Sequence, residues 1–267
     1  MPETSALPDS LSLDVRGDVA VLTLDRARKR NALDTTTVLG LEAFFTAPPE
    51  EVRAVVLHGD GDHFCAGLDL SDLSATTVED GLHHSRMWHR VMGAVQLGRL
   101  PVVSALKGAV IGGGLELASA THLRVAERSA FYALPEGQRG LFLGGGGSVR
   151  LPRLIGVARM TDLMLTGRVY DAQEGHDAGL SHYLVDDGDG LDLALELATK
   201  AAAVAPMTTY AVLQALPRIA EVGPHEGYLL ESLMAAVASS SEDAQARMRE
   251  FLEGRAARVA APAQDAR

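Results

Sequence analysis

Hydrophobic positions along the first 190 residues alternate between a spacing typical of strands and a spacing typical of helices. Val52–Leu57 and Val102–Leu106 are short apolar runs, which favour strands buried on both faces of a sheet. Helical spacing is clearest in Leu33–Phe45 and His83–Arg99. Strands that alternate with helices predict an α/β fold with a parallel sheet.

Further elements follow from the same pattern, and the chain changes character near residue 190. The additional strands are expected at Leu11–Val15, Val19–Leu24, Leu123–Ala126, Ala130–Ala133 and Leu180–Val185, and the additional helices at Val157–Thr166 and Asp171–Ala178. Ser71–Asp80 is polar and predicts a loop. From Leu191 onward the pattern is helical throughout, over 191–204, 206–219, 225–238 and 241–256. We therefore predict a core domain over 1–190 and a helical subdomain over 191–267.

Composition narrows the class of protein. A formal net charge of -11 argues against nucleic-acid binding, which needs a basic surface. A single cysteine, Cys65, excludes an intrachain disulfide. The chain contains no charge-free apolar run of membrane-spanning length, and its first residues lack the pattern of a signal peptide. These features predict a cytoplasmic protein that does not enter a membrane.

Two glycine-containing segments follow predicted strands. Phe64–Leu70 could direct backbone N–H groups into a pocket, although an ordinary turn from strand to loop would look the same. Lys107–Ala118 passes through Gly112–Gly114 into a helix, whose first turn carries free N–H donors and a positive dipole end. That end suits a developing oxyanion. Glu116 on this first turn is either a working carboxylate or a carboxylate that only stabilises the helix end.

A third segment, Leu134–Gly140, carries Glu136 and precedes a second glycine run, Gly144–Gly147. A carboxylate in such a loop can transfer protons or can simply be solvated. None of the three segments has the spacing of a phosphate-binding fingerprint.

The order and spacing of these segments resemble the crotonase (enoyl-CoA hydratase/isomerase) superfamily from about Leu11 to Arg255. The matching pieces are Asn31–Leu33, Phe64–Leu70, Gly112–Ala118, Leu134–Glu136, Arg150–Gly156 and Leu165–Arg168. The resemblance, which is strongest to enoyl-CoA hydratases, implies a crotonase-like spiral of ββα repeats with a C-terminal helical subdomain.

The resemblance also implies roles for individual residues. The backbone N–H groups of Leu68 and Gly113 would form an oxyanion hole for the thioester carbonyl. Glu116 and Glu136 occupy both glutamate positions of a hydratase, in which one carboxylate activates water for attack at Cβ and the other delivers a proton to Cα. Isomerases of the family usually keep only the carboxylate at the Glu136 position, so the pair favours hydration or the reverse dehydration.

The remaining implied features concern the ligand and the assembly. Candidate residues for binding the acyl-CoA substrate are Arg28, Lys29, Arg30, Ala66, Gly67, Asp69, Gly112 and Arg255, of which the basic ones can also be plain surface charges. CoA is part of the substrate, so no separate cofactor is expected. His83, His84 and His89 lack the spacing and the carboxylates of a metal site, and no metal is expected. The family resemblance implies a homotrimer or a dimer of trimers.

Several alternatives stay open. Dienoyl-CoA isomerases share the Gly-Leu-Asp-Leu piece but carry a further aspartate where this chain has Gly144. Gln138 or Arg139 near the acyl site would indicate an unusual acyl group, as would the departure of Leu143–Gly147 from the usual glycine loop. Isomerisation, hydrolysis, decarboxylation and acyl-CoA binding without turnover are the competing functions.

Overall fold

The computed structural model describes residues 7–72 and 77–255, which form two compact units that we treat separately. The first unit ends at Ala203 and the second begins at Val204. The domain boundary expected after residue 190 falls at the start of helix α7 (Gly190–Ala202), which packs on the sheet of the first unit.

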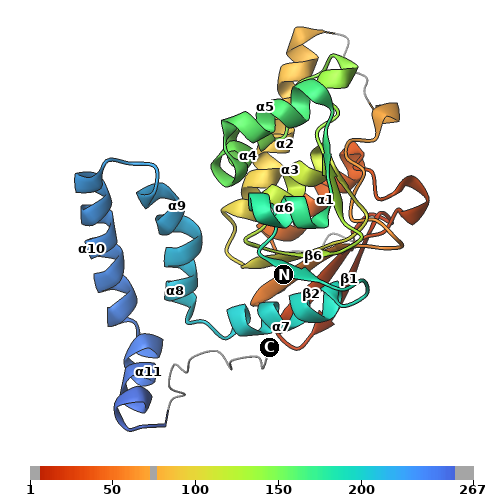
Figure 1. Ribbon diagram of the computed structural model, residues 1–267. Coiled ribbons are helices and arrows are strands. Elements are labelled where there is room, and N and C mark those ends of the chain that lie inside the picture. Colours follow the sequence, from red (N-terminus) through yellow and green to blue (C-terminus); the bar gives the residue numbers. More distant parts are fainter. Residues whose placement is uncertain (1–6, 73–76, 256–267) are drawn as a thin grey trace, which may run out of the picture. The chain divides into compact units, whose positions relative to one another are not determined.

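A six-stranded sheet forms the centre of the first unit (Figure 1). Its strands, in spatial order, are β1 (Leu11–Arg16), β2 (Val19–Leu24), β3 (Ala54–Gly59), β4 (Val102–Leu106), β6 (Leu123–Glu127) and β9 (Tyr183–Val185). β1 pairs with β2 in antiparallel fashion, and the other neighbouring pairs are parallel. The predicted α/β class with a parallel sheet is therefore confirmed.

Both faces of the central strands β2, β3 and β4 are buried, and the side chains of β2 show how. Val19 and Val21 point to one face, where they pack with Ala194 and Ala198 of α7. Ala20, Leu22 and Leu24 alternate with them and join the larger core on the other face. Two-sided burial explains why the central strands are almost purely apolar in sequence.

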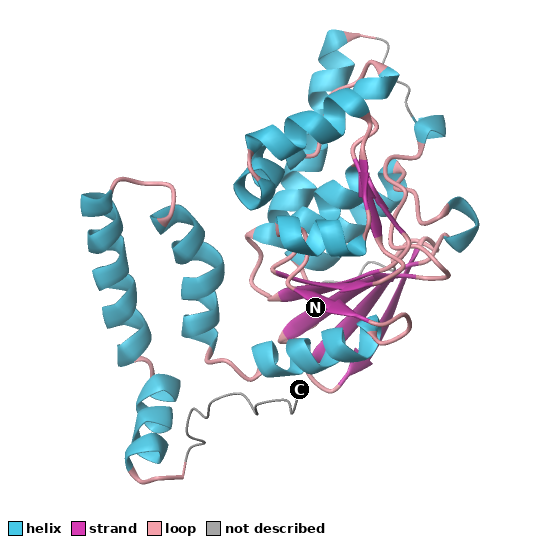
Figure 2. Ribbon diagram, in the orientation of Figure 1, coloured by secondary structure: helices cyan, strands magenta, loops and turns pink. Residues whose placement is uncertain are grey.

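The opposite face carries the other helices and a small second sheet (Figure 2). That sheet contains β5 (Ala109–Ile111), β7 (Phe131–Ala133) and β8 (Val169–Tyr170), with β5 and β7 parallel and β7 and β8 antiparallel. The helices are α1 (Thr35–Thr46), α2 (Val78–Gln96), α3 (Gly113–Ala120), α4 (Gly147–Ile155), α5 (Val157–Thr166) and α6 (Ala172–Ala178), with short 3-10 turns η1 (Ala27–Lys29), η2 (Leu70–Asp72) and η3 (Gly137–Arg139).

Two helices differ from the sequence-based expectation. α2 begins at Val78 rather than at His83, because Thr77 and Asp80 form a capping box that starts the helix inside the expected polar loop. The part of that loop over 73–76 lies outside the described residues. α4 was not predicted, since three glycines precede it, a fourth is its first residue and Pro152 lies inside it, and both residue types normally disfavour a helix.

The second unit is helical, as predicted for this part of the chain. It contains α8 (Pro206–Tyr210), a π-helical turn η4 (Ala211–Ala215), α9 (Leu216–Ile219), α10 (Pro224–Ser240) and α11 (Glu242–Leu252). α10 packs against the α8–η4–α9 segment within this unit. Among the described residues of the whole chain, every helix is too short or too polar to cross a lipid bilayer.

Candidate active site

A cavity of about 440 Å³ opens in the first unit, where the three glycine-containing segments of the sequence meet. Leu68, Gly113, Glu116 and Glu136 all line it. Segments that are far apart in the chain thus converge on one concave space, as expected for a ligand site. The structure brings together every residue for which the sequence suggested a direct chemical role.

The segment Cys65–Asp69 leaves one backbone donor free, and that donor belongs to Leu68. Its neighbours are engaged: the Ala66 N–H donates to the Arg30 carbonyl at 2.9 Å, and the Asp69 N–H donates to the Leu33 carbonyl at 2.9 Å. The Gly67 N–H approaches the Cys65 sulfur at 3.4 Å. The Leu68 N–H donates to no acceptor within the described residues. A free amide at a cavity wall can stabilise a negatively charged oxygen.

Gly113, the first residue of α3, supplies a second N–H that donates to no acceptor in the described part of the chain, since no carbonyl of the same helix is in reach. The two amide segments lie close together. The Leu68 nitrogen is 3.3 Å from the position that a Cβ atom on Gly113 would take. Gly67 has a φ of +96°, and a Cβ there would lie 2.8 Å from the Ile111 carbonyl oxygen, so this turn needs glycine to reach α3.

Glu116 is buried on the first turn of α3 and is held by the glycine run. Its Oε1 accepts hydrogen bonds at 2.8 Å from the backbone N–H groups of Gly145 and Gly147. Burial raises the pKa of Glu116, while these two N–H donors and the Arg150 charge act in the opposite direction. Because Oε1 is occupied, Oε2 is the oxygen available to the cavity that Glu116 lines.

Glu136 lies at the start of η3 in a contrasting environment. Its Oε2 is buried and accepts no hydrogen bond from the described residues. Burial raises the pKa of Glu136 to about 7, and the nearby Glu116 charge acts in the same direction. The other oxygen occupies the space beside Gly112, where the φ of +52° and the carboxylate itself leave no room for a side chain. Glu136 therefore lies next to Gly112, the residue that precedes Gly113.

Arg150 of α4 holds the glycine run in place, a role that was not predicted from the sequence. Its guanidinium donates to the Gly145 carbonyl at 2.7 Å, to the Glu116 carbonyl at 3.2 Å and to the Ser119 hydroxyl at 3.0 Å. α4 thereby fixes the loop whose amides bind Glu116. The signal that could have found Arg150 was its place in the matched Arg-Leu-Pro motif.

One face of α2 forms another wall. His84 and Ser85 share this face with Trp88 because they precede it by four and three residues. The Ser85 hydroxyl donates to the Gly144 carbonyl at 2.7 Å, and the Trp88 indole N–H donates to His84 Nε2 at 3.3 Å. The helical periodicity of α2 is the signal that could have identified this face, which was not predicted from the sequence.

The two polar residues after Glu136 have different surroundings. Arg139 lines the cavity, together with the apolar side chains of Leu141, Phe142 and Leu143. Gln138 instead donates to the Leu165 carbonyl at 2.8 Å and is not part of the cavity wall. Of the two residues suspected of contacting the acyl group, only Arg139 is placed to do so.

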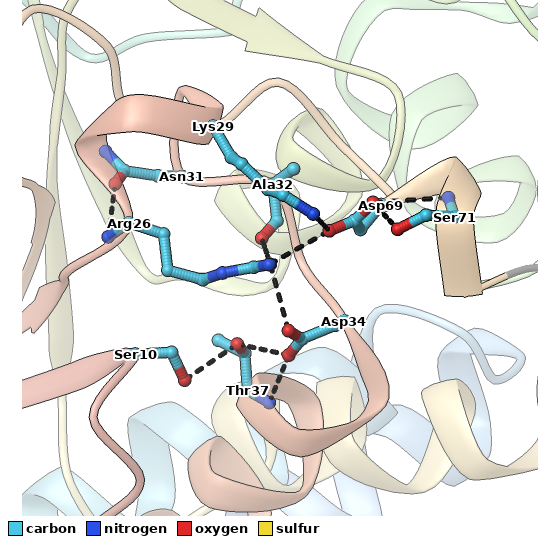
Figure 3. Close-up of polar contacts among 9 residues, drawn as sticks. All are labelled: Ser10, Arg26, Lys29, Asn31, Ala32, Asp34, Thr37, Asp69 and Ser71. Carbon is cyan, nitrogen blue, oxygen red and sulfur yellow. Dashed lines mark hydrogen bonds and ion pairs between the residues drawn. The ribbon is translucent and has the colours of Figure 1, made fainter.

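The basic residues proposed for CoA binding fall into two groups. Arg28 and Lys29 in η1, with the adjacent Arg30, are exposed on the first unit. Lys29 donates to the Asp69 carboxylate at 2.7 Å (Figure 3). Arg255 belongs to the second unit, where it pairs with Glu253. Ala66, Gly67 and Gly112 line the cavity, whereas Asp69 does not.

A parallel α/β core with a cavity built from two glycine turns and two glutamates defines this protein as a member of the crotonase class. Comparisons with known proteins agree. The family model described as enoyl-CoA hydratase/isomerase matches residues 14–260, and the chain belongs to this family.

Individual relatives are similar over nearly their whole length. The chain is 32% identical to enoyl-CoA hydratase EchA19 of Mycobacterium tuberculosis, over 93% of this chain and 95% of that protein. It is 58% identical to a Rhodopseudomonas palustris protein provisionally described as an enoyl-CoA hydratase, with a TM-score of 0.90 over 92% of this chain and 95% of the other. The enoyl-CoA hydratase from Bacillus anthracis is 32% identical, with a TM-score of 0.86 over 92% and 97% of the two chains. These findings confirm the predicted family and the prediction of an enoyl-CoA hydratase-like enzyme.

Proposed function

We propose that this protein adds water across the 2,3 double bond of an enoyl-CoA thioester. The observation that carries the proposal is the convergence of two free backbone amides and two unlike glutamates on one cavity. The amides of Leu68 and Gly113 would bind the thioester oxygen and stabilise the enolate-like transition state. One preorganised donor of this kind can contribute about 3 kcal/mol.

The environments of the glutamates support separate roles. Glu116 accepts two backbone N–H bonds, which favour its ionised form, so it would take a proton from water as the oxygen attacks Cβ. Glu136 is desolvated and its Oε2 accepts from no donor among the residues that the structure describes, which favours its protonated form, so it would deliver a proton to Cα. Water is consumed, one C–O and one C–H bond form, and the two glutamates exchange protonation states.

The part of the cavity wall that would contact the acyl group is mostly apolar and carries one positive charge. Trp88, Leu141, Phe142 and Leu143 offer apolar contact, and Arg139 adds a positive charge. One relative, the (E)-benzylidenesuccinyl-CoA hydratase of Thauera aromatica, is 31% identical over 92% of this chain and 97% of that protein. An acyl group with an aromatic ring or a polar terminus is therefore a sensible addition to a substrate panel.

The decisive experiment follows the loss of 2-enoyl thioester absorbance with crotonyl- to decenoyl-CoA and an aromatic enoyl-CoA. Glu116→Gln and Glu136→Gln are the matched variants. Hydration predicts that each change lowers kcat by about 100-fold or more, since general acid and base groups typically contribute that much. No absorbance loss with any substrate would reject the proposal, and CoA-ester binding without turnover would then indicate a binding protein.

Isomerisation of the double bond is the second candidate, because the family name covers both activities. A Glu116→Gln variant that keeps full activity would favour it, since an isomerase needs the Glu136 carboxylate alone. We further propose that the enzyme works without a separate cofactor, in the cytoplasm, and as a homotrimer or dimer of trimers. Light scattering of the purified protein tests the last point.

A further inference from the structure

Asp69 immediately follows the free amide of Leu68 but faces away from the cavity. Leu68 and Leu70 line the cavity, whereas the Asp69 side chain is buried on the opposite side of the segment. Its Oδ2 accepts from Arg26 at 2.9 Å and from Lys29 at 2.7 Å, and its Oδ1 accepts from the Ser71 hydroxyl at 2.6 Å (Figure 3). A carboxylate with three donors is fixed in direction.

The backbone around Leu68 is tied to the same part of the chain. The Leu33 N–H donates to the Gly67 carbonyl at 2.8 Å, and the Asp69 N–H donates to the Leu33 carbonyl at 2.9 Å. Leu68 therefore lies between two residues whose backbone is hydrogen-bonded to Leu33, and its own N–H takes part in neither hydrogen bond. The Asp69 side chain adds a third anchor on the cavity-distal side.

One of the two cations that hold Asp69, Arg26, is itself fixed by further contacts. Arg26 donates to the Ala32 carbonyl at 2.5 Å and pairs with Asp34 at 3.1 Å. Asp34 caps helix α1 by accepting from the Thr37 N–H at 2.8 Å. The side-chain hydrogen bonds from Lys29, Ser71 and Arg26 also hold the pKa of Asp69 well below its usual range. Asp69 is thus ionised at every working pH and links the Leu68 segment to a rigid part of the fold.

We propose that Asp69 is a positioning residue for the oxyanion hole, which fixes the direction of the Leu68 N–H through its ion pairs with Arg26 and Lys29. The inference rests on the proposed role of that N–H in binding the thioester oxygen. It assigns Asp69 a task other than contact with CoA.

Asp69→Asn is the test variant and Asp34→Asn is its matched control. Both remove one carboxylate that pairs with Arg26, but only Asp69 is attached to the Leu68 segment. Asparagine remains a good helix cap at position 34. The readout is the carbonyl stretch of bound butyryl-CoA carrying ¹³C at the thioester carbon, measured by infrared difference spectroscopy at saturating ligand. Butyryl-CoA has no double bond, so the measurement is independent of hydration.

The wild-type protein is expected to shift the carbonyl band to lower frequency, and Asp34→Asn to keep that shift. Asp69→Asn is expected to lose a clear part of it and to lower kcat about 10-fold, because misplacing a catalytic contact is costly. Asp69→Glu, which keeps the charge, should restore part of the shift. A band and kcat unchanged in Asp69→Asn, with only a lower Tm, would show a purely structural role and overturn the inference.

Should Asp69→Asn fail to fold, Lys29→Met takes its place, since the Lys29 side chain is exposed and its loss removes one of the two cations. A partial loss of the band shift at saturating ligand supports the inference, and an unchanged band rejects it. A wild-type protein that polarises the carbonyl but hydrates no enoyl-CoA would reject the proposed function alone. The two failures are therefore distinguishable.

Discussion

Glu116 and Glu136 line the same cavity, but the hydrogen-bond donors around their carboxyl groups differ. Two backbone N–H groups bind Oε1 of Glu116, whereas Oε2 of Glu136 is buried and accepts nothing from the described residues. Both carboxyls are desolvated, but two donors from the glycine run and the Arg150 charge offset burial at Glu116, whereas at Glu136 the offset comes from its own backbone N–H and from Arg139. Burial therefore raises the pKa of Glu136 further than that of Glu116, and such separated pKa values are the condition for acid and base roles at one pH.

The first prediction concerns the pH dependence of hydration. Burial raises the pKa of Glu136 to about 7, and an acid must be protonated to act. kcat/KM should therefore fall as pH rises through about 7, following a single ionisation. The ionisation belongs to the coupled pair, so the apparent value can differ between probes. A profile that is flat from pH 6 to 9, or that rises with pH over this range, would contradict the assignment of Glu136 as the acid.

A second prediction links the same carboxyl to stability. The pKa of Glu136 rises from 4.5 to about 7 on folding, so the folded state binds more protons and loses stability as pH increases between these values. Replacing the Glu136 carboxyl by an amide should remove this loss of stability at higher pH. The full effect at about 1.4 kcal/mol per pKa unit would be about 3 kcal/mol, and partial solvent access reduces it to about 1–2 kcal/mol.

Urea denaturation of the wild type and Glu136→Gln at pH 5 and pH 8 measures this effect. The free energy of unfolding of the variant minus that of the wild type should be larger at pH 8 than at pH 5. A constant offset caused by the new amide does not affect the comparison, because it is the same at both pH values. An equal difference at the two pH values would refute the prediction.

A third prediction tests the space between the two free amides. A Cβ atom on Gly113 would lie 3.1 Å from two Trp88 ring carbons and 3.3 Å from the Leu68 nitrogen. Gly113→Ala should therefore obstruct the position of the thioester oxygen and lower kcat by about 100-fold, as loss of an oxyanion-hole donor does. Initial rates with the best substrate of the panel give the value.

Gly93→Ala is the matched control, because Gly93 lies inside helix α2 with no atom within 4 Å of the added Cβ. Alanine in a helix interior should raise stability by about 0.5–1 kcal/mol and leave kcat unchanged. Equal activity of the two variants would show that Gly113 is not close to the reacting oxygen.

The strands and glycine turns of this protein could be predicted from its sequence more fully than its side-chain contacts. The strands of the main sheet were predictable because burial on both faces gives apolar runs such as Val102–Leu106. The glycine turns could be recognised as ordered pieces of a family pattern. α4 could not, because its stability depends on tertiary contacts, such as those of Arg150, that override Pro152 and the glycines.

The site shows the same limit. That Gly145 and Gly147 bind Glu116 across about 30 positions of sequence follows from the path of the chain and leaves no local signal. The direction of Asp69 is a similar case. A Gly-Leu-Asp-Leu segment does not tell which side chains face the cavity, since a shift of one residue in a strand-like segment exchanges the two sides.

The last prediction concerns Arg139, which follows Glu136 by one turn and lines the cavity with it. Its positive charge lowers the pKa of Glu136 and so opposes the effect of burial. Arg139→Gln should raise that pKa further, which keeps the acid protonated to higher pH and moves the descending limb of the kcat/KM profile upward. Arg139→Lys keeps the charge and should leave the limb near its wild-type position.

Higher salt should move the wild-type limb in the same direction as Arg139→Gln, because an exposed charge is screened. If Arg139→Gln instead leaves the profile in place while KM rises for substrates with a carboxylate or another polar terminus, Arg139 contacts the acyl group and does not tune Glu136.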